Sequence, residues 1–137
     1  MRKIDLDCLM KNSTWASSTV LNQTLPPVSS IVHNENQHNL LFDLSPELPW
    51  FEGHFPGNPV LAGIVQLHWA VRCAMCLLGF KSPPLEVARL KYKNIIVPPA
   101  SVELTLLLVK EHQVQFEFCS PGKIHSLGRL VFAVEVA

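Results

Sequence analysis

The chain has 137 residues, the length of one ordinary domain, and two independent domains are not expected. Apolar residues make up 48% of it and charged residues only 16%, which is the composition of a packed globular protein with apolar surface left for self-association. Eleven basic residues balance eleven acidic ones and form no stripe, so neither nucleic acid nor an anionic membrane surface is an expected partner.

Residues 1–27 carry no periodic apolar pattern, and we treat them as an N-terminal extension whose structure the sequence leaves open. Their first part, MRKIDLDCLMKNS, lacks the apolar run that follows the basic residues of a secretory signal. The four cysteines are not spaced as a disulfide framework. Both observations favour a cytoplasmic protein, in which residues 28–137 form a single domain.

A hairpin is expected at the beginning of this domain. The apolar pair at 31–32 precedes the polar turn 34–37, and apolar residues alternate after the turn at Leu40, Phe42 and Leu44. The segment SPELP at 45–49 then breaks the second strand.

The stretch from Val60 to Gly79 is apolar nearly all round, which predicts a helix that the rest of the chain must cover. Gly79 and the prolines at 83 and 84 end it. Arg72 argues against a membrane span, because an arginine near mid-bilayer costs about 2.5 to 3.5 kcal/mol. Cys73 and Cys76 form a C-x-x-C inside the helix, and we interpret them as packed residues rather than as a redox pair or half of a metal site.

Four segments of strand period follow the helix, over residues 88–93, 102–108, 113–118 and 130–134. Short turns separate them. Closely spaced strands predict an antiparallel sheet, and a single helix that is apolar on all sides is most simply covered by that sheet. The expected fold class is therefore α+β, with a curved antiparallel sheet wrapped around one long central helix.

The loop before the helix carries a resemblance that periodicity cannot supply. The stretch GHFPGNPVLAG at 53–63 resembles the signature loop of the hot-dog-fold 3-hydroxyacyl-[acyl-carrier-protein] dehydratases, and KNIIVPP at 93–99 resembles the family's strand-to-turn segment. The resemblance covers about residues 30–136. Within the family, WFEGHF at 50–55 together with VQLHWA at 65–70 is most similar to the dehydratases of aryl-polyene clusters.

The resemblance implies a hot-dog fold that dimerises by joining two sheets, with two active sites at the subunit interface. The substrate would be an acyl carrier protein carrying a 3-hydroxyacyl chain, and water would leave to give a trans-2-enoyl thioester with no metal or other cofactor. His54 would take the proton from C2, and the backbone N–H of Gly63 would polarise the thioester carbonyl. Phe51, Phe55 and Trp69 are candidates for lining the acyl tunnel.

One position departs seriously from the family. Family members have an aspartate or glutamate fourteen residues after the loop histidine, supplied by the partner chain, which protonates the departing hydroxyl; this chain has His68 there. His68 could replace that acid only as imidazolium, whose reference pKa is about 6.5, with His54 neutral beside it. A working pair would therefore be most active below neutral pH. A milder departure is Ala62, which stands where the family usually has proline.

Other interpretations stay open. His68 could be an ordinary core histidine paired with Arg72 or Gln66. The assembly could be a homodimer, or a heterodimer with a related hot-dog subunit that supplies a carboxylate to His54. The chain could also be a non-catalytic partner subunit, or a hot-dog thioesterase, although the sequence offers no good candidate for orienting a hydrolytic water.

Some polar residues lie outside the motifs. The other histidines, among them His125, lie in expected turns or strand ends and need no role. Lys91 and Lys93 mark a solvated strand face, with contact to an acidic carrier protein as a secondary hypothesis.

Overall fold

The computed structural model describes residues 25–26, 28–48, 51 and 60–134. The predictions for residues 1–24, for His54 and for Phe55 therefore fall outside the described residues. The elements follow one another as β1 (Val28–His33), β2 (Gln37–Leu44), α2 (Gly63–Leu78), β3 (Glu86–Tyr92), β4 (Ala100–Lys110), β5 (Gln113–Ser120) and β6 (Lys123–Val131).

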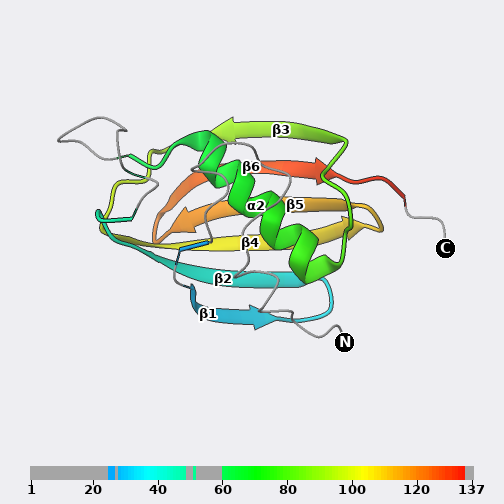
Figure 1. Ribbon diagram of the computed structural model, residues 1–137, viewed down its shortest axis with the longest axis horizontal. Helices are drawn as coiled ribbons and strands as arrows, with labels where there is room; N and C mark the ends of the chain where they lie inside the picture. The colour runs from blue at the N-terminus through cyan, green and yellow to red at the C-terminus, as the bar shows by residue number, and fades with distance from the viewer. Residues whose placement is uncertain (1–24, 27, 49–50, 52–59, 135–137) are drawn as a thin grey trace.

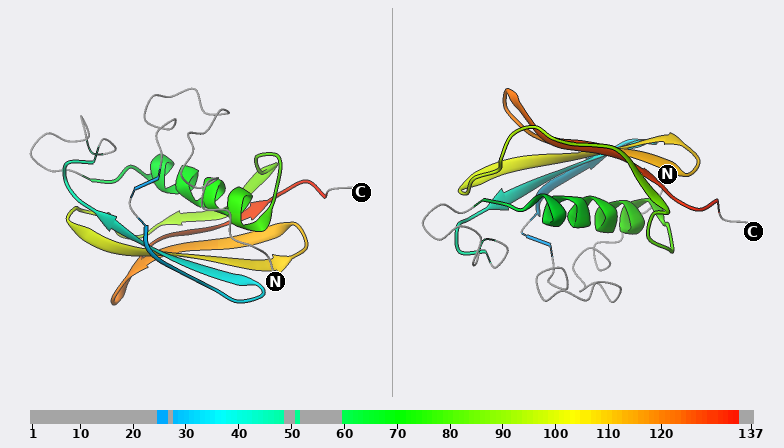
Figure 2. Two further views of the ribbon diagram at one scale, coloured as in Figure 1. Left: turned by 60° about the horizontal axis from the view of Figure 1, so that its bottom comes forward. Right: turned by 90° about the horizontal axis from the view of Figure 1, so that it is seen from above.

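The six strands form one antiparallel sheet in the order β1-β2-β4-β5-β6-β3 (Figure 1). β1 and β3 are its edge strands. The sheet is curved, and α2 lies along one of its faces (Figure 2). The predicted hairpin, the long helix and the α+β architecture are thus confirmed.

The core lies between α2 and the inward-facing side chains of the strands. Trp69 is 1% exposed, and its ring centroid lies 5.7 Å from that of Phe42 on β2. Phe42 in turn lies 6.5 Å from Phe118 on β5. Large aromatic side chains dominate core energetics, so this row of rings fixes the helix over the centre of the sheet.

Both ends of α2 follow from local chemistry. Gly79 ends the helix in the left-handed region at φ 80°, and its N–H donates to the Met75 carbonyl at 3.0 Å. The helix begins at Gly63, three residues later than the apolar run suggests, because Ala62 is extended (ψ 143°) and the Leu61 N–H donates to the Ile96 carbonyl at 2.9 Å.

The last predicted strand needs correction. The segment 130–134 is only the end of β6, which begins at Lys123 and ends at Val131. Apolar alternation missed its first half because polar His125 and Ser126 are buried there, at 5% and 0% exposure. Their hydroxyl and ring atoms are hydrogen-bonded, which makes this burial possible.

The cysteines correct a second expectation. Cys76 is disulfide-bonded, whereas Cys73 and Cys119 are free thiols. Spacing along a chain signals only local pairs, so it did not predict this bond. The two cysteines of the C-x-x-C are not bonded to each other, and Cys73 is fully buried in the core. No helix in the described ranges is long and apolar enough to span a membrane.

Candidate active site

The first turn of α2 offers a free backbone donor. The N-cap residue Ala62 makes no side-chain capping bond, and the first turn contains no acidic residue. The Ala62 carbonyl accepts the N–H groups of Val65 and Gln66, at 3.1 and 3.2 Å. No hydrogen bond between described residues uses the Gly63 N–H, which therefore remains available to an acceptor at the positive end of the helix dipole.

A cavity of about 440 Å³ lies beside this donor. It lies between the residues around the start of α2 and the segment that follows β3. Its lining consists of Val60, Leu61, Ala62, Gly63, Gln66, Tyr92, Lys93, Asn94 and Ile95. A second cavity, of about 510 Å³ between β2 and the start of β4, contains none of the predicted site residues.

Tyr92, at the end of β3, covers Gly63. Its hydroxyl donates to the Gly63 carbonyl at 3.0 Å. A Cβ atom at position 63 would lie 2.7 Å from two atoms of the ring, so only glycine fits under the ring as it stands. Burial raises the pKa of the Tyr92 phenol above its ordinary value, so the hydroxyl keeps its donating proton to a higher pH than a free tyrosine does.

Gln66 connects the helix start to the sheet. Its side-chain Nε2 donates to the Leu61 carbonyl at 3.2 Å, and its Oε1 accepts the Ser126 hydroxyl at 2.7 Å. Gln66 is 3% exposed and Ser126 is fully buried. Because both side chains are shielded from water, these hydrogen bonds hold them in a single arrangement.

His125 fixes the opposite wall of the cavity, although the sequence suggested no role for it. Its Nδ1 lies 3.2 Å from the Asn94 carbonyl oxygen and 3.1 Å from that of Ile95, and its Nε2 lies 2.8 Å from the Ser120 hydroxyl. Nδ1 must therefore donate, because a carbonyl oxygen can only accept. The His125 carbonyl also accepts the Lys93 N–H at 2.8 Å, so this residue anchors the segment 93–95.

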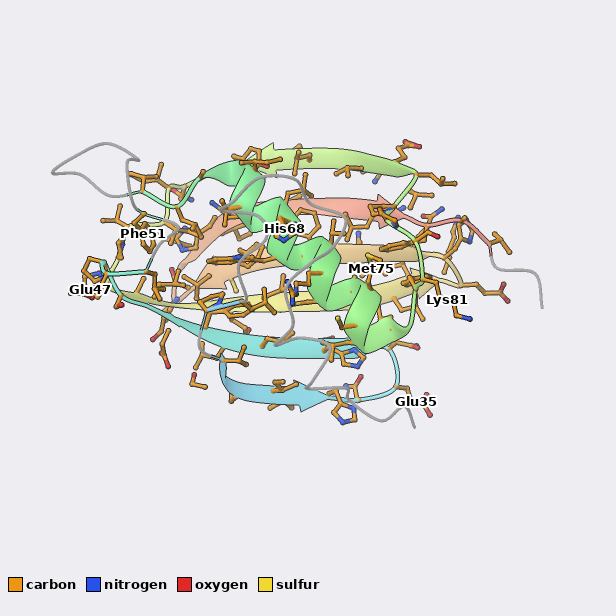
Figure 3. The ribbon with its side chains drawn as sticks, viewed as in Figure 1. Glu35, Glu47, Phe51, His68, Met75 and Lys81 are labelled. Atoms are coloured by element: carbon orange, nitrogen blue, oxygen red, sulfur yellow. The ribbon has the colours of Figure 1, made fainter. Side chains whose placement is uncertain are left out.

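His68 does not line this cavity. It is 5% exposed and lies in the first half of α2, with Met75 further along the helix (Figure 3). Gln66 faces the sheet, and a residue two positions later is turned by about 200° around a helix. His68 therefore lies on the helix face away from the sheet.

Arg72 lies one turn after His68 on that same face. Its side chain is 4% exposed, and its Nη1 has no hydrogen-bond partner. Burial lowers the pKa of the guanidinium. A buried cation with an unsatisfied donor is costly, and no carboxylate of the described residues contributes to its electrostatics.

The aromatic candidates have mainly core surroundings. Phe51 is 5% exposed and lies on the side of the molecule where α2 begins (Figure 3), and Trp69 packs on Phe42. Neither belongs to the cavity lining beside Gly63, so their place in an acyl tunnel stays a prediction. Among the described residues there is no cluster of three or more His, Cys, Asp or Glu side chains that could hold a metal ion.

A curved antiparallel sheet along one helix, with a cavity at the helix start, defines a hot-dog-fold protein, and solved structures confirm that fold. The dehydratase heterocomplex ApeI:P from Xenorhabdus doucetiae superposes with a TM-score of 0.72 at 24% identity, over 79% of this chain and 97% of that one. An uncharacterized protein from Erwinia carotovora subsp. atroseptica gives 0.66 at 24% identity, over 79% and 95%. The dehydratase domain of PpsC from Mycobacterium tuberculosis, in complex with C12:1-CoA, gives 0.66 at 18% identity, over 80% and 44%.

The chain belongs to the ApeI-like family, since the family model described as ApeI dehydratase matches residues 30–129. It is 32% identical over 80 residues to the 3-hydroxyacyl-[acyl-carrier-protein] dehydratase FabZ of Haemophilus influenzae (strain PittEE), covering 52% of this chain and 53% of the relative. FabZ of Pseudoalteromonas translucida (strain TAC 125) is 29% identical over 98 residues, covering 64% and 63%. The chain spans about half the length of the curated relatives it matches. The predicted family resemblance is confirmed.

Proposed function

We propose that this chain is a subunit of a 3-hydroxyacyl-[acyl-carrier-protein] dehydratase, which removes water from a 3-hydroxyacyl thioester to leave a trans-2-enoyl thioester. The observation that carries the proposal is the Gly63 N–H at the start of α2, which bonds to none of the described residues and lies beside a cavity of about 440 Å³. Loss of the C2 proton places negative charge on the thioester oxygen, and a fixed backbone donor stabilises that charge.

The base in this proposal is His54, which the family motif places nine residues before Gly63. A neutral imidazole removes the C2 proton while the Gly63 N–H binds the carbonyl oxygen. General acid–base catalysis of this kind contributes about 10²- to 10⁴-fold to a rate. The fatty-acid and aryl-polyene pathways are both sources of such substrates, and a cytoplasmic location would suit a carrier-protein substrate.

His68 is poorly suited to act as the acid that protonates the departing hydroxide. His68 would have to be charged to donate a proton, and Arg72, one turn along the same helix face, already carries a positive charge there. Like charges four residues apart on a helix oppose each other. This favours a second candidate function, in which the chain is the partner subunit of a heterodimer whose other subunit supplies the carboxylate. The likeness to the ApeI:P dehydratase heterocomplex supports this alternative.

The edge strand β3 is the surface we propose for the partner subunit. Apolar side chains on and around it are uncovered: Leu85 is 75% exposed, Tyr92 50% and Ile95 67%. An unpaired edge with apolar side chains is a template for pairing with another strand, so two sheets can join there. Lys93, at the cavity, would remain beside this junction and could contact an acidic carrier protein.

The test is an assay of the purified full chain on a 3-hydroxyacyl pantetheine thioester, beside His54→Ala, His68→Asp and the control His112→Ala. Activity in the parent that falls about 10²- to 10⁴-fold in His54→Ala, and not in His112→Ala, supports a catalytic subunit. An inactive parent that gains activity in His68→Asp supports the partner-subunit function. Hydrolysis to a free acid without enoyl product would overturn both in favour of a thioesterase.

A further inference from the structure

The start of α2 is built without the usual cap. A Ser, Thr, Asp or Asn at the N-cap stabilises a helix by accepting N–H groups of the first turn. Such a cap would place a competing oxygen beside the donor that the proposed function requires. Ala62 makes no side-chain cap, so the first turn must be stabilised in another way.

The stabilising bonds go to carbonyl groups instead. The Tyr92 hydroxyl donates to the Gly63 carbonyl at 3.0 Å, and Gln66 Nε2 donates to the Leu61 carbonyl at 3.2 Å. The Leu61 N–H is itself bonded to the Ile96 carbonyl at 2.9 Å. These bonds fix residues 61 and 63 on both sides of the Ala62–Gly63 peptide, and none of them uses the Gly63 N–H.

Both side-chain donors depend on one position of the sheet, although Gln66 itself lies on α2. Tyr92 on β3 is paired directly with Ser126 on β6, and Ser126 donates to Gln66 Oε1 at 2.7 Å. That bond makes Oε1 the acceptor, so the amide of Gln66 must turn its Nε2 toward Leu61. We call Tyr92, Gln66 and Ser126 the helix-start clamp.

The peptide that carries the donor is also polarised. The Ala62 carbonyl accepts two N–H groups, at 3.1 and 3.2 Å, and its peptide partner is the Gly63 N–H. Hydrogen bonds accepted by a carbonyl strengthen the N–H of the same peptide as a donor. The direction of the Gly63 N–H bond and its strength as a donor therefore both depend on the geometry of the first turn of α2.

We infer that Tyr92 and Gln66 are positioning residues, which through the helix-start clamp aim the Gly63 N–H at the thioester carbonyl. The inference rests on the proposed function. Its prediction is specific: removing either side-chain donor weakens polarisation of the bound thioester while the fold is retained.

Single-atom or near-isosteric variants suit the test. Tyr92→Phe deletes only the hydroxyl of a half-exposed ring, so the chain should fold in any case. Gln66→Met keeps the side-chain length and deletes both clamp bonds. Thr105→Val is the matched control, because it removes a comparable side-chain bond, from Asn39 at 2.9 Å, between β2 and β4 and away from α2.

The probe is 2,4-hexadienoyl pantetheine thioester, whose ultraviolet absorption moves to longer wavelength when its carbonyl is polarised by hydrogen bonding. Binding to the full-length chain is followed by difference spectroscopy, which requires no turnover and so does not depend on His68. Gly63→Pro serves as the reference for a missing donor, because proline is tolerated at the first position of a helix but has no N–H. Its ring also displaces Tyr92, so this variant lacks both the donor and the Tyr92 bond.

The expected result is a clear red shift in the parent and in Thr105→Val, no shift in Gly63→Pro, and at most half the parent's shift in Tyr92→Phe and Gln66→Met. In whichever assembly is catalytically active, the homodimer or the heterodimer, the two clamp variants should lose about tenfold in kcat with less than a twofold change in KM. This loss is smaller than the one caused by deleting an oxyanion donor. A full shift in both clamp variants would overturn the inference and leave the proposed function standing. No shift in the parent, or a full shift in Gly63→Pro, would instead refute the role of Gly63.

Discussion

Gly63 and Gly128 each lie against an aromatic ring, and an added Cβ at either position would stand 2.7 Å from a ring atom. The rings differ in their freedom to move. Tyr92 over Gly63 is 50% exposed, whereas Phe116 over Gly128 is 2% exposed and packed in the core. We therefore expect the same substitution, glycine to alanine, to have very different costs at the two positions.

For Gly128→Ala, the ring cannot leave the core, and overpacking costs about 1–3 kcal/mol. Replacing glycine in a strand returns about 0.5–1 kcal/mol, so the net loss should be about 1 kcal/mol and at most about 2.5 kcal/mol. For Gly63→Ala, the Tyr92 ring can turn toward solvent, and the loss of its hydrogen bond costs about 0.5–1.5 kcal/mol. The better helix propensity of alanine offsets about 1 kcal/mol, which leaves a change within about 0.5 kcal/mol.

The measurement is urea unfolding followed by tryptophan fluorescence, at one fixed protein concentration because the apparent stability of any chain that associates depends on its concentration. The double variant Gly128→Ala with Phe116→Leu should recover part of the loss, since the smaller side chain makes room for the methyl group. If Gly63→Ala costs as much as Gly128→Ala, exposure of the neighbouring ring does not decide the cost and the reasoning fails.

Two further predictions concern buried groups on α2. Arg72→Met should raise the free energy of unfolding of the isolated chain by about 1–2 kcal/mol, because it removes a buried guanidinium whose Nη1 has no partner; a loss of stability in urea would contradict this. Burial raises the pKa of the Cys73 thiol to about 12 from 9.0, so it should resist alkylation at pH 8 until the protein is unfolded in urea. Because its pKa is raised on folding, the stability that the neutral thiol contributes is complete below pH 9 and is lost as the pH rises toward about 12. Alkylation of Cys73 in the native protein at pH 8 would show that the thiol is accessible.

Local sequence patterns predicted most of the fold because, in most elements, the apolar periodicity and the residues at the ends favour the same structure that the chain adopts. The apolar run up to Leu78 is long, and Gly79 ends it with the left-handed conformation that glycine favours. Edge strand β3 shows the limit of such reasoning. Its apolar alternation predicted a covered face, yet Leu90 is 36% and Tyr92 50% exposed, and none of the described strands pairs with the outer side of this edge.

The site was predicted only where a motif marks it. Gly63 belongs to the contiguous loop motif, so its place at the helix start could be expected from sequence. Tyr92 and Ser126 act on the helix across 29 and 60 residues of chain, and no spacing rule connects such pairs. A polar Gln66 in an apolar helix was the one visible signal, because a buried amide needs partners somewhere in the fold.

The two halves of the proposed reaction therefore depend on this chain in different ways. In the proposed function, the thioester carbonyl would be bound by the start of α2, held in place by the paired strands β3 and β6, all of which this chain supplies. Protonation of the leaving hydroxide needs an acid, and the face of α2 that would present it carries His68 beside a buried cation. A partner carboxylate would supply the acid without any change at Gly63, since His68 and the cavity lie on different faces of the helix. Under the proposed function, replacing the usual carboxylate by histidine would remove the acid and leave carbonyl binding intact, which is the division of roles that the heterodimer proposal predicts.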